Sequence, residues 1–436
     1  MQALVIKIIF ATVVSFVLLN SKVIAADKCL HLSLRTNMLG FSGICKKGVV
    51  YYDNKQVNET VPMAPGCLKS KIIPMSHRKK WSKTERESFV KLRKKCQKQM
   101  KNWYAEYLLY SKDGLRNTMV LFWHNHFTSS LKKVKEPQLI YKQHISIEKL
   151  SLGSFDELLK AILFDSAMLI YLDNNSNVKE KPNENFAREL LELFTLGVGN
   201  YTEDDVKGVA RSLTGLTVDK ETFETVFVED MHDKGNKIIF DKSGNYNPEA
   251  VLGLILEKPE AARYITEKIW SHFISVVDNE MVDELSDDFY KNWDIEKLVV
   301  TIIESDQFNL DKGQMIKSPL ELITGTVRVV GNRMVKPEDI TRYSAQMGMD
   351  LFDPPNVKGW PFGSEWVSSG RLLVRLNFLG RVLRGVNMNN SNLSHRLCES
   401  IELNYYTAMP PLQTMGSTTC LGKIEQLLSD PVWQLK

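Results

Sequence analysis

The sequence predicts a mainly α-helical protein, with one large multi-helical domain and a small β-hairpin insertion. Apolar residues recur three and four positions apart along much of the chain from Ser82 onward, which is the spacing of amphipathic helices. Helix-start signals precede several of these stretches, including Thr202 before three acidic residues and Pro259 before a long amphipathic run. Helices are expected near residues 155–171, 183–196, 203–213, 248–256, 259–275, 294–305 and 316–330.

Strand signals are few and short. The alternation of polar and apolar residues over Thr222–Val228 predicts a strand, which we expect to pair with Lys237–Phe240 as the inserted hairpin. Val49–Tyr52 predicts another small strand within a turn-rich region.

The first 25 residues have the pattern of a secretory signal peptide. Lys7 precedes an apolar run, Ile8–Leu19, and Val23-Ile24-Ala25 supplies the small residues of a cleavage site. The run is shorter than the ~20 residues that cross a bilayer. We therefore expect cleavage near Ala26, export to the periplasm or the extracellular space, and no transmembrane span in the mature chain. An uncleaved anchor is the alternative.

The remaining chain divides into three parts by composition. Residues 26–76 form a short Cys-containing N-terminal segment, residues 77–390 the helical domain, and residues 391–436 a Cys-containing C-terminal tail. The chain after Asn387 is rich in Asn, Ser and Thr, which predicts a loosely packed appendage.

The six cysteines indicate disulfides, because compartments outside the cytoplasm are oxidising. Free buried thiols are the alternative, and the sequence does not decide which cysteines pair. No Cys-x-x-Cys motif supports a zinc knuckle or a thioredoxin-type centre. The candidates are Cys29, Cys45, Cys67, Cys96, Cys398 and Cys420.

The formal net charge is +4, but basic residues concentrate between His77 and Lys101. This run could contact anionic envelope polymers or lipid headgroups, or it could be a solvated helix face. Nucleic acid is not expected as the partner of an exported protein.

The predicted helix that follows Asn183 combines apolar and charged residues. Its apolar positions cover most of its circumference, so we expect it to be buried. Glu184, Arg188 and Glu192 are spaced four apart and would share one face, with Glu189 beside them. They form either a structural arginine–carboxylate network or a site that holds a metal or moves protons.

A calcium-loop pattern lies just upstream. Asp173, Asn175, Asn177 and Glu184 occupy positions 1, 3, 5 and 12 of the template, with a helix at its end. Val178 stands where the template needs glycine. The alternatives are a hard-cation loop and an asparagine-rich turn.

Histidines supply the remaining candidate ligands. His124 and His126 can face one ion only if the helix ends there, since residues two apart on a helix point in nearly opposite directions. His232 and Asp233 could complete a histidine–carboxylate site, with isolated structural histidines as the alternative. We expect these residues and Glu184 to converge on one polar pocket, because each lies among apolar neighbours and needs a partner.

A further segment, Asp353–Pro361, is a rigid turn. Its prolines fix φ, and Trp360 with the nearby Trp366 offers flat aromatic faces. Such faces can stack on sugars, or the loop can simply pack over the helical core.

Several motifs follow one another along the chain. They lie at residues 122–127 (FWHNHF), 171–174 (YLDN), 182–197 (PNENFARELLELFTLG), 201–206 (YTEDDV), 210–215 (ARSLTG), 232–235 (HDKG), 316–319 (IKSP) and 354–361 (PPNVKGWP). In this order they resemble one bacterial family, the domain-of-unknown-function family numbered 1800. The resemblance covers roughly residues 100 to 385 and leaves out the cysteine-bearing ends. It implies an exported helical protein without an established activity, often encoded beside a sulfatase-like partner.

Two functions follow from these residues. The first is an exported envelope protein that binds or assembles, with a buried polar His/Glu/Arg cluster. The family resemblance implies a co-exported sulfatase-like protein as its partner. The second is a metal-dependent envelope hydrolase that uses the same cluster with a divalent cation as cofactor. No GxSxG motif, Walker loop or dinucleotide fingerprint points to another enzyme class.

Overall fold

The computed structural model describes residues 61–330, 335–388 and 419–436, together with residues 407, 409–412 and 417 and the backbone of two strands, β1 (Gly43–Lys46) and β2 (Val49–Tyr52). The predicted signal peptide lies outside the described residues. Across the described part, the chain is mainly helical, as predicted, and its strands pair as small two-stranded antiparallel sheets. None of the described helices is both long and apolar enough to cross a membrane.

The first half of the chain leads from the N-terminal region to the hairpins. Its helices are α2 (Gly66–Lys69), α3 (Met75–Lys79), α4 (Lys83–Tyr110), α5 (Gly114–His126), α6 (Leu131–Val134), α7 (Pro137–Leu150), α8 (Phe155–Leu163), α9 (Ser166–Tyr171), η1 (Asn174–Ser176), α10 (Asn185–Glu189), η2 (Leu190–Thr195), α11 (Glu203–Ser212) and η3 (Glu229–Met231).

The second half is helical to its end. Its helices are α12 (Pro248–Leu256), α13 (Pro259–Phe273), α14 (Asn279–Asn292), α15 (Ile295–Glu304), α16 (Asp306–Leu310), α17 (Pro319–Val330), α18 (Pro337–Gln346), η5 (Gly363–Val367), α19 (Ser369–Met388), α21 (Cys420–Ser429) and η7 (Pro431–Gln434).

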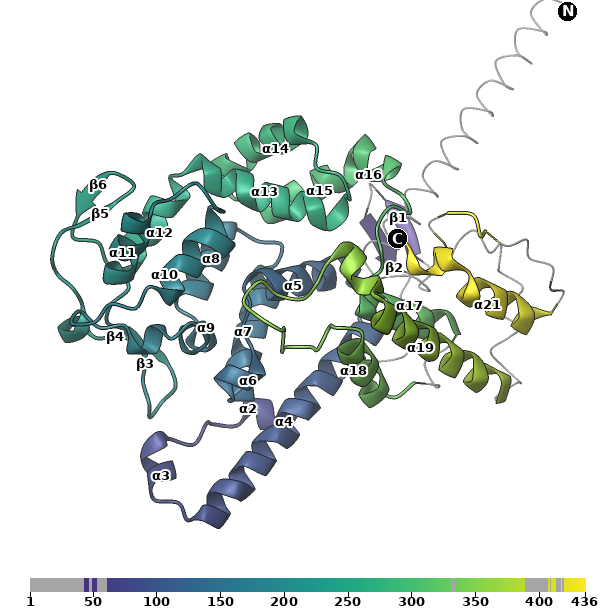
Figure 1. Cartoon of the computed structure of the whole chain (residues 1–436), viewed down its shortest axis with the longest axis horizontal. Helices are drawn as coiled ribbons and strands as arrows, with labels where there is room; N and C mark the ends of the chain where they lie inside the picture. The colour runs from purple at the N-terminus through teal and green to yellow at the C-terminus, as the bar shows by residue number, and fades with distance from the viewer. Residues whose placement is uncertain are drawn as a thin grey trace, which may run out of the picture.

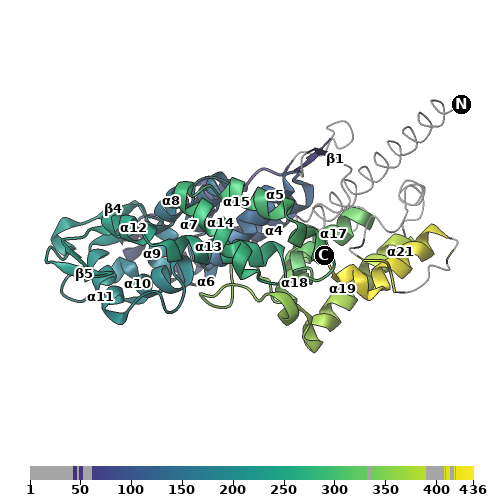
Figure 2. The same ribbon diagram turned by 90° about the horizontal axis from the view of Figure 1, so that it is seen from above.

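The molecule is elongated, with two hairpins made by the strands β3 (Leu216–Val218) to β6 (Lys242–Gly244) at one end and the C-terminal helices at the other (Figures 1 and 2). Helices α8 to α12 gather beside the hairpins, α5 and α7 lie in the middle, and α17, α19 and α21 form the far end. Helix α4 extends from the middle of the body down to α3 (Figure 1). One continuous apolar core connects these parts, from Leu68 near the start of the described chain to Trp433 near its end.

Capping explains where the principal helices begin. Ser82 and Thr202 each form a capping box, in which the hydroxyl accepts from the backbone N–H three residues later and that residue's carboxylate accepts in return. Pro259 occupies the first turn of α13, where its missing N–H costs nothing. The predicted starts of α11 and α13 are therefore confirmed.

The predicted hairpin pairing is wrong. The strand β4 (Thr225–Phe227) pairs with β3 (Leu216–Val218), whereas β5 (Lys237–Ile239) pairs with β6 (Lys242–Gly244). The Asp219 carboxylate accepts from the backbone N–H groups of Glu221 and Thr222, which closes the turn between β3 and β4. Each strand thus finds a partner next to it in sequence, and the insertion contains two hairpins instead of one.

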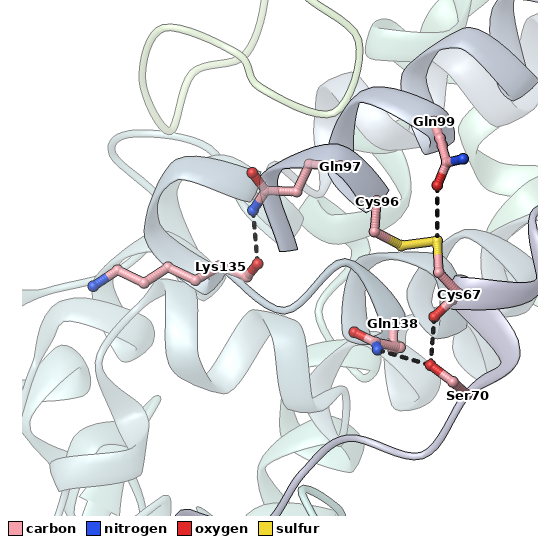
Figure 3. The surroundings of a disulfide bond; sticks show 7 residues. All are labelled: Cys67, Ser70, Cys96, Gln97, Gln99, Lys135 and Gln138. Atoms are coloured by element: carbon pink, nitrogen blue, oxygen red, sulfur yellow. Dashed lines mark hydrogen bonds between the residues drawn. A yellow bond between two sulfur atoms is a disulfide. The ribbon is translucent and has the colours of Figure 1, made fainter. Parts of the chain in front are cut away.

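A disulfide joins Cys67 on α2 to Cys96 on α4 (Figure 3). The Gln97 side chain donates to the carbonyls of Leu131 and Lys135, so α4 is also held at this level to the loop around α6. Cys29 and Cys398 lie outside the described residues, and of Cys45 and Cys420 only the backbone is described. Their predicted pairing stays a prediction.

The prediction of a loosely packed C-terminal tail is wrong for residues 420–436. Helix α21 packs on α19, and Leu435 forms an antiparallel bridge with Ile316. Trp433 is completely buried, and the Lys317 ammonium lies 4.3 Å from its ring centroid. This packing comes from the apolar residues of the last turns of the chain, which follow a polar stretch in the sequence.

Candidate functional site

Helix α5 carries both histidines of the WHNH motif to its last turn. Nε2 of His124 lies 3.0 Å from Nδ1 of His144 on α7, while Nε2 of His126 lies 3.0 Å from the carbonyl oxygen of Phe194. The two imidazoles therefore take different partners, as expected for residues two apart on a helix. Burial lowers the pKa of His124 to about 3 and that of His126 to about 4, so both rings are neutral near pH 7.

The helix that follows Asn183 changes its geometry halfway. It begins as α10 and becomes a single π-helical turn, η2, which ends at Thr195, two residues before Gly197. Such turns are rare and often occur at functional sites. Gly197 has φ +77°, and a Cβ there would lie 2.7 Å from the Tyr264 ring, so both the helix end and the close contact require glycine.

Side chains from other helices satisfy the carbonyls at the end of η2. The Tyr264 hydroxyl of α13 donates to the carbonyl of Leu193, and the Nε2–H of His126 donates to that of Phe194. These carbonyls have no partner within their own helix. The bond to Phe194 fixes the His126 tautomer and leaves Nδ1 as the acceptor of that ring.

The charged residues of this helix do not form the expected buried network. Arg188 binds Glu184 at 3.1 Å and Glu203 at 2.6 Å, and its side chain is 35% exposed. These hydrogen bonds raise the pKa of Arg188, the Glu203 bond most. Because the helix widens at Leu190, residues four apart across that point no longer stack, and Glu192 instead accepts from the Tyr201 hydroxyl at 3.1 Å.

His232 and Asp233 serve the hairpin region. Nδ1 of His232 lies 2.9 Å from the carbonyl oxygen of Thr214, and Asp233 pairs with Arg211 of α11 at 2.6 Å. The Arg211 hydrogen bond lowers the pKa of Asp233. These contacts attach the loop after β4 to α11, and each group has a partner of its own.

The calcium-loop residues form an asparagine-rich turn. The buried Asn177 side chain donates to Asn174 and to the carbonyl of Ala210, and its oxygen accepts from the backbone of Asn183. Asp173 pairs with Lys133 at 2.7 Å, Glu184 pairs with Arg188, and Asn175 is exposed. In the part of the chain that the structure describes, no three or more His, Cys, Asp or Glu side chains are placed to hold a metal ion.

A cavity of about 390 Å³ lies where three of the sequence motifs meet. The WHNH helix, the end of η2 and the PPNVKGW loop are far apart in sequence, and each contributes side chains to its wall. Helix α13 closes the remaining side. The lining residues are Phe122, Asn125, His126, Glu192, Leu193, Gly197, Val198, Tyr264, Lys268, Val357 and Lys358.

The cavity brings together groups of both charges. Lys268 and Lys358 are exposed lining residues, and the Lys268 ammonium lies 5.0 Å from the Tyr264 ring centroid. Burial raises the pKa of Tyr264 to about 12. Burial also raises the pKa of the neighbouring Glu189; the charge of Glu192 adds to this shift, whereas Arg188 and Lys358 oppose it. The cavity therefore presents two ammonium groups, the carboxylate of Glu192 and a neutral imidazole.

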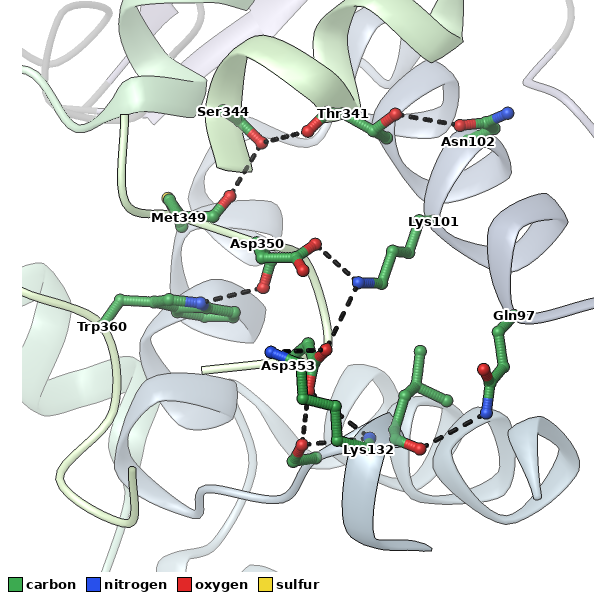
Figure 4. A network of polar contacts seen from close by, with 12 residues as sticks. Gln97, Lys101, Asn102, Lys132, Thr341, Ser344, Met349, Asp350, Asp353 and Trp360 are labelled. Atoms are coloured by element: carbon green, nitrogen blue, oxygen red, sulfur yellow. Dashed lines mark hydrogen bonds and ion pairs between the residues drawn. The ribbon is translucent and has the colours of Figure 1, made fainter. Parts of the chain in front are cut away.

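The PPNVKGW loop is fixed in place by specific contacts. The Asn125 side-chain oxygen accepts from the backbone N–H of Trp360 at 2.6 Å, and the Trp360 indole donates to the carbonyl of Asp350 (Figure 4). Asp353 lies close to the ammonium groups of Lys101 and Lys132, at 3.7 and 3.2 Å. The loop therefore holds Lys358 at the cavity without needing a ligand to order it.

A second, smaller hollow of about 70 Å³ shares Phe122 and Asn125 with this cavity. Its other walls include Trp360 and Trp366, so it is rich in aromatic surface. The Phe122 ring stacks on His126, with 5.9 Å between ring centroids, and contacts His272 at 5.2 Å. Phe122 therefore belongs to the wall that the two hollows share.

Of the predicted site residues, the cavity includes His126 and Glu192 among its lining, and Glu189 lies nearby. Sequence reasoning missed Tyr264 and Lys268, which lie four apart on α13 and share a face, but which look like ordinary positions of an amphipathic helix. Lys358 lies in the motif at residues 354–361, and its position in a proline-rich, rigid loop was the feature of the sequence that could have indicated a role at the site.

Comparison with known proteins gives one result. The family model described as "Protein of unknown function (DUF1800)" matches residues 36–429. The match is longer than the resemblance at residues 100–385 and includes every cysteine except Cys29, so the expectation that both cysteine-bearing ends lie outside it is wrong. No curated protein and no solved structure matches the chain. The chain belongs to the DUF1800 family.

Proposed function

We propose that this protein is an exported envelope protein that binds a small acidic sugar in the cavity between α5, η2, α13 and the PPNVKGW loop. The observation that carries the proposal is the convergence of three separated motifs on one cavity. Ligand sites are typically concave, with apolar walls and a few polar groups at fixed positions. Of the polar cluster expected from the sequence, His126 and Glu192 line this wall.

The chemistry of the wall indicates the ligand. Lys268 and Lys358 can bind a carboxylate, while Glu192 and the amide of Asn125 can bind hydroxyl groups. His126, neutral and held in one tautomer, offers a hydrogen-bond acceptor. The rings of Phe122 and Tyr264 offer flat faces for the C–H face of a sugar.

The export part of the proposal has two supports. The N-terminal sequence has the pattern of a signal peptide. The disulfide between Cys67 and Cys96 is typical of proteins from oxidising compartments. A sulfatase-like partner rests on the family resemblance alone, and co-purification of the two exported proteins from their native host would test it.

The hydrolase alternative has no support from the predicted ligands. His124, His126 and His232 each take a different hydrogen-bond partner, and Asp233 pairs with Arg211. A shared metal centre would need these side chains around one point, within about 2 Å of it. The binding function therefore has the stronger structural support.

Isothermal titration calorimetry of the purified protein with sodium glucuronate and with glucose tests the proposal. We expect saturable binding of glucuronate and weaker binding of glucose. Lys268→Gln should weaken glucuronate binding about tenfold, since a hydrogen bond to a charged group contributes about 1.5 kcal/mol. Lys291→Gln, at an exposed lysine on α14, should leave the affinity unchanged.

Two results would overturn the proposal. One is no saturable binding of glucuronate at concentrations up to about 10 mM, where even a weak site would respond. The other is equal loss of affinity in the Lys268→Gln and Lys291→Gln variants, which would show that the titrated site lies elsewhere.

A further inference from the structure

Four lysines lie along one face of α4: Lys91, Lys94, Lys95 and Lys98, which we call the lysine stripe. Their spacing of three, four and seven residues places them on one side of the helix. All four side chains are exposed, while Cys96 and Met100 of the same helix are buried. We propose that the lysine stripe is a docking surface for an anionic lipid membrane. This inference is independent of the proposed sugar site.

Three partly buried basic residues near the stripe form ion pairs, but the stripe lysines do not. Arg78 and Arg93 both pair with Glu136, and Lys101 pairs with Asp350 at 2.6 Å. No stripe lysine forms an ion pair with any carboxylate in the described residues. Within the described part of the chain, the stripe therefore presents four exposed ammonium groups without a paired carboxylate.

The charge of the whole molecule is divided unevenly. Residues 79–98 contain nine basic and two acidic residues, a formal charge of +7, whereas the complete chain carries +4. The other 416 residues therefore carry −3. An anionic surface attracts this helix and repels the remainder, which orients the molecule as it approaches.

The shape of the surface favours a membrane over a small anion. The stripe runs about 10 Å along a convex helix, and no cavity described above includes any of its residues. Beside it, Leu92 is 66% exposed, an apolar side chain that a lipid interface can accept and water does not favour. Each lysine near an anionic bilayer adds to the attraction, so several act together.

The stripe is also held rigidly. The disulfide at Cys96 lies between Lys95 and Lys98 in sequence, and Gln97 donates to the carbonyl of Lys135 (Figure 3). Gln97 also donates to the carbonyl of Leu131. Binding to a membrane would therefore not require this part of the helix to become ordered first.

Vesicle co-sedimentation tests the inference with the full-length mature protein. The probes are vesicles of phosphatidylcholine alone and of phosphatidylcholine with about 30% phosphatidylglycerol, at increasing NaCl. We expect binding only to the anionic vesicles, weakening as salt rises. The variant K91Q/K94Q/K95Q/K98Q should bind about a thousandfold more weakly.

The matched control is K149Q/K220Q/K291Q/K336Q, which removes four exposed lysines elsewhere and the same formal charge. This control variant should keep most of the wild-type affinity for anionic vesicles. Equal loss in the two quadruple variants would show a net-charge effect and overturn the proposal, as would salt-independent binding. Circular dichroism and thermal midpoints establish that both variants fold.

A polyanion other than lipid is the competing partner, and Leu92→Ser distinguishes the two. This variant should weaken vesicle binding several-fold and leave binding to a random-sequence DNA duplex unchanged, because only the bilayer takes up the apolar side chain. If wild-type protein binds the duplex more tightly than anionic vesicles at the same salt, the stripe is not a membrane surface.

Discussion

The side-chain oxygen of Asn125 accepts a hydrogen bond from the backbone N–H of Trp360, which lies 235 residues further along the chain. Gly359 makes this contact possible. Its φ is +90°, and a Cβ at that position would lie 2.2 Å from the Asn125 oxygen. One amide side chain thus joins the end of α5 to the loop that carries Lys358, and it fixes two walls of the cavity relative to each other.

Replacing Gly359 with alanine should therefore be costly. The added methyl group would collide with Asn125, and the left-handed backbone would become strained, so we expect a loss of at least about 2 kcal/mol in the free energy of unfolding. Gly253→Ala is the matched control. Gly253 lies within α12 with open space around it, and alanine there should stabilise by about 0.5–1 kcal/mol. Urea denaturation measures both, and a change of the same sign in the two variants would contradict the account.

Most of the fold could be predicted from local patterns. Helical spacing and capping residues gave α11, α12 and α13 nearly to the residue, because these signals lie within a few positions of each element. The prediction of the hairpin pairing failed because the turn that decides the pairing depends on a side-chain contact of Asp219. The prediction of a loosely packed C-terminus failed because Trp433 contacts Lys317, which lies 116 residues away in sequence.

The candidate site was predicted only in part. His126 and Glu192 were selected because polar groups among apolar neighbours need partners. The expected convergence with His232 did not follow, since that ring finds a backbone carbonyl at Thr214 instead. Lys268 and Tyr264 lie on an ordinary amphipathic helix, and only the tertiary packing shows that they face the cavity.

The His124–His144 pair should make stability depend on pH. Burial lowers both pKa values, that of His124 to about 3, so the folded protein keeps these rings neutral while the unfolded chain protonates them below about 6.5. The stabilising contribution of each ring is full above pH 6.5 and is lost as pH falls below it, for His124 down to about pH 3. In that window His124 should contribute about 1.4 kcal/mol per pH unit.

The comparison of wild type with His124→Gln isolates this effect. Between pH 6.5 and 4.5, the free energy of unfolding should fall less in the variant than in the wild type. The difference should equal the contribution of about one buried histidine. Asp165, whose pKa is raised by burial to about 7, acts in the opposite direction but is present in both proteins. Parallel pH profiles for the two proteins would show that His124 is already protonated or accessible in the folded state.

The Cys67–Cys96 disulfide should stabilise the N-terminal region. It closes a loop of 29 residues, for which restriction of the unfolded chain predicts about 3–4 kcal/mol. The C67S/C96S variant should lose this amount in guanidinium denaturation. Dithiothreitol should destabilise the wild type by at least as much. Any effect of dithiothreitol on the C67S/C96S variant would come from the other four cysteines. A guanidinium midpoint of C67S/C96S equal to that of the wild type would contradict the prediction.

Two arginines with opposite exposure test which polar network stabilises the fold. Arg188 is 35% exposed and pairs with carboxylates at the surface, so Arg188→Ala should cost no more than about 1 kcal/mol. Arg375 is completely buried, and its guanidinium donates to the carbonyls of Trp366 and Lys317 and to the Gln434 side chain. Arg375→Ala would leave these acceptors buried without a donor and create a cavity between α17, α19 and the C-terminal residues. We expect it to cost at least about 3 kcal/mol. Calorimetric unfolding of both variants decides the order. A larger loss in Arg188→Ala would contradict this order. It would mean that the exposed ion pair with Glu203 contributes more to the free energy of unfolding than the buried hydrogen bonds of Arg375.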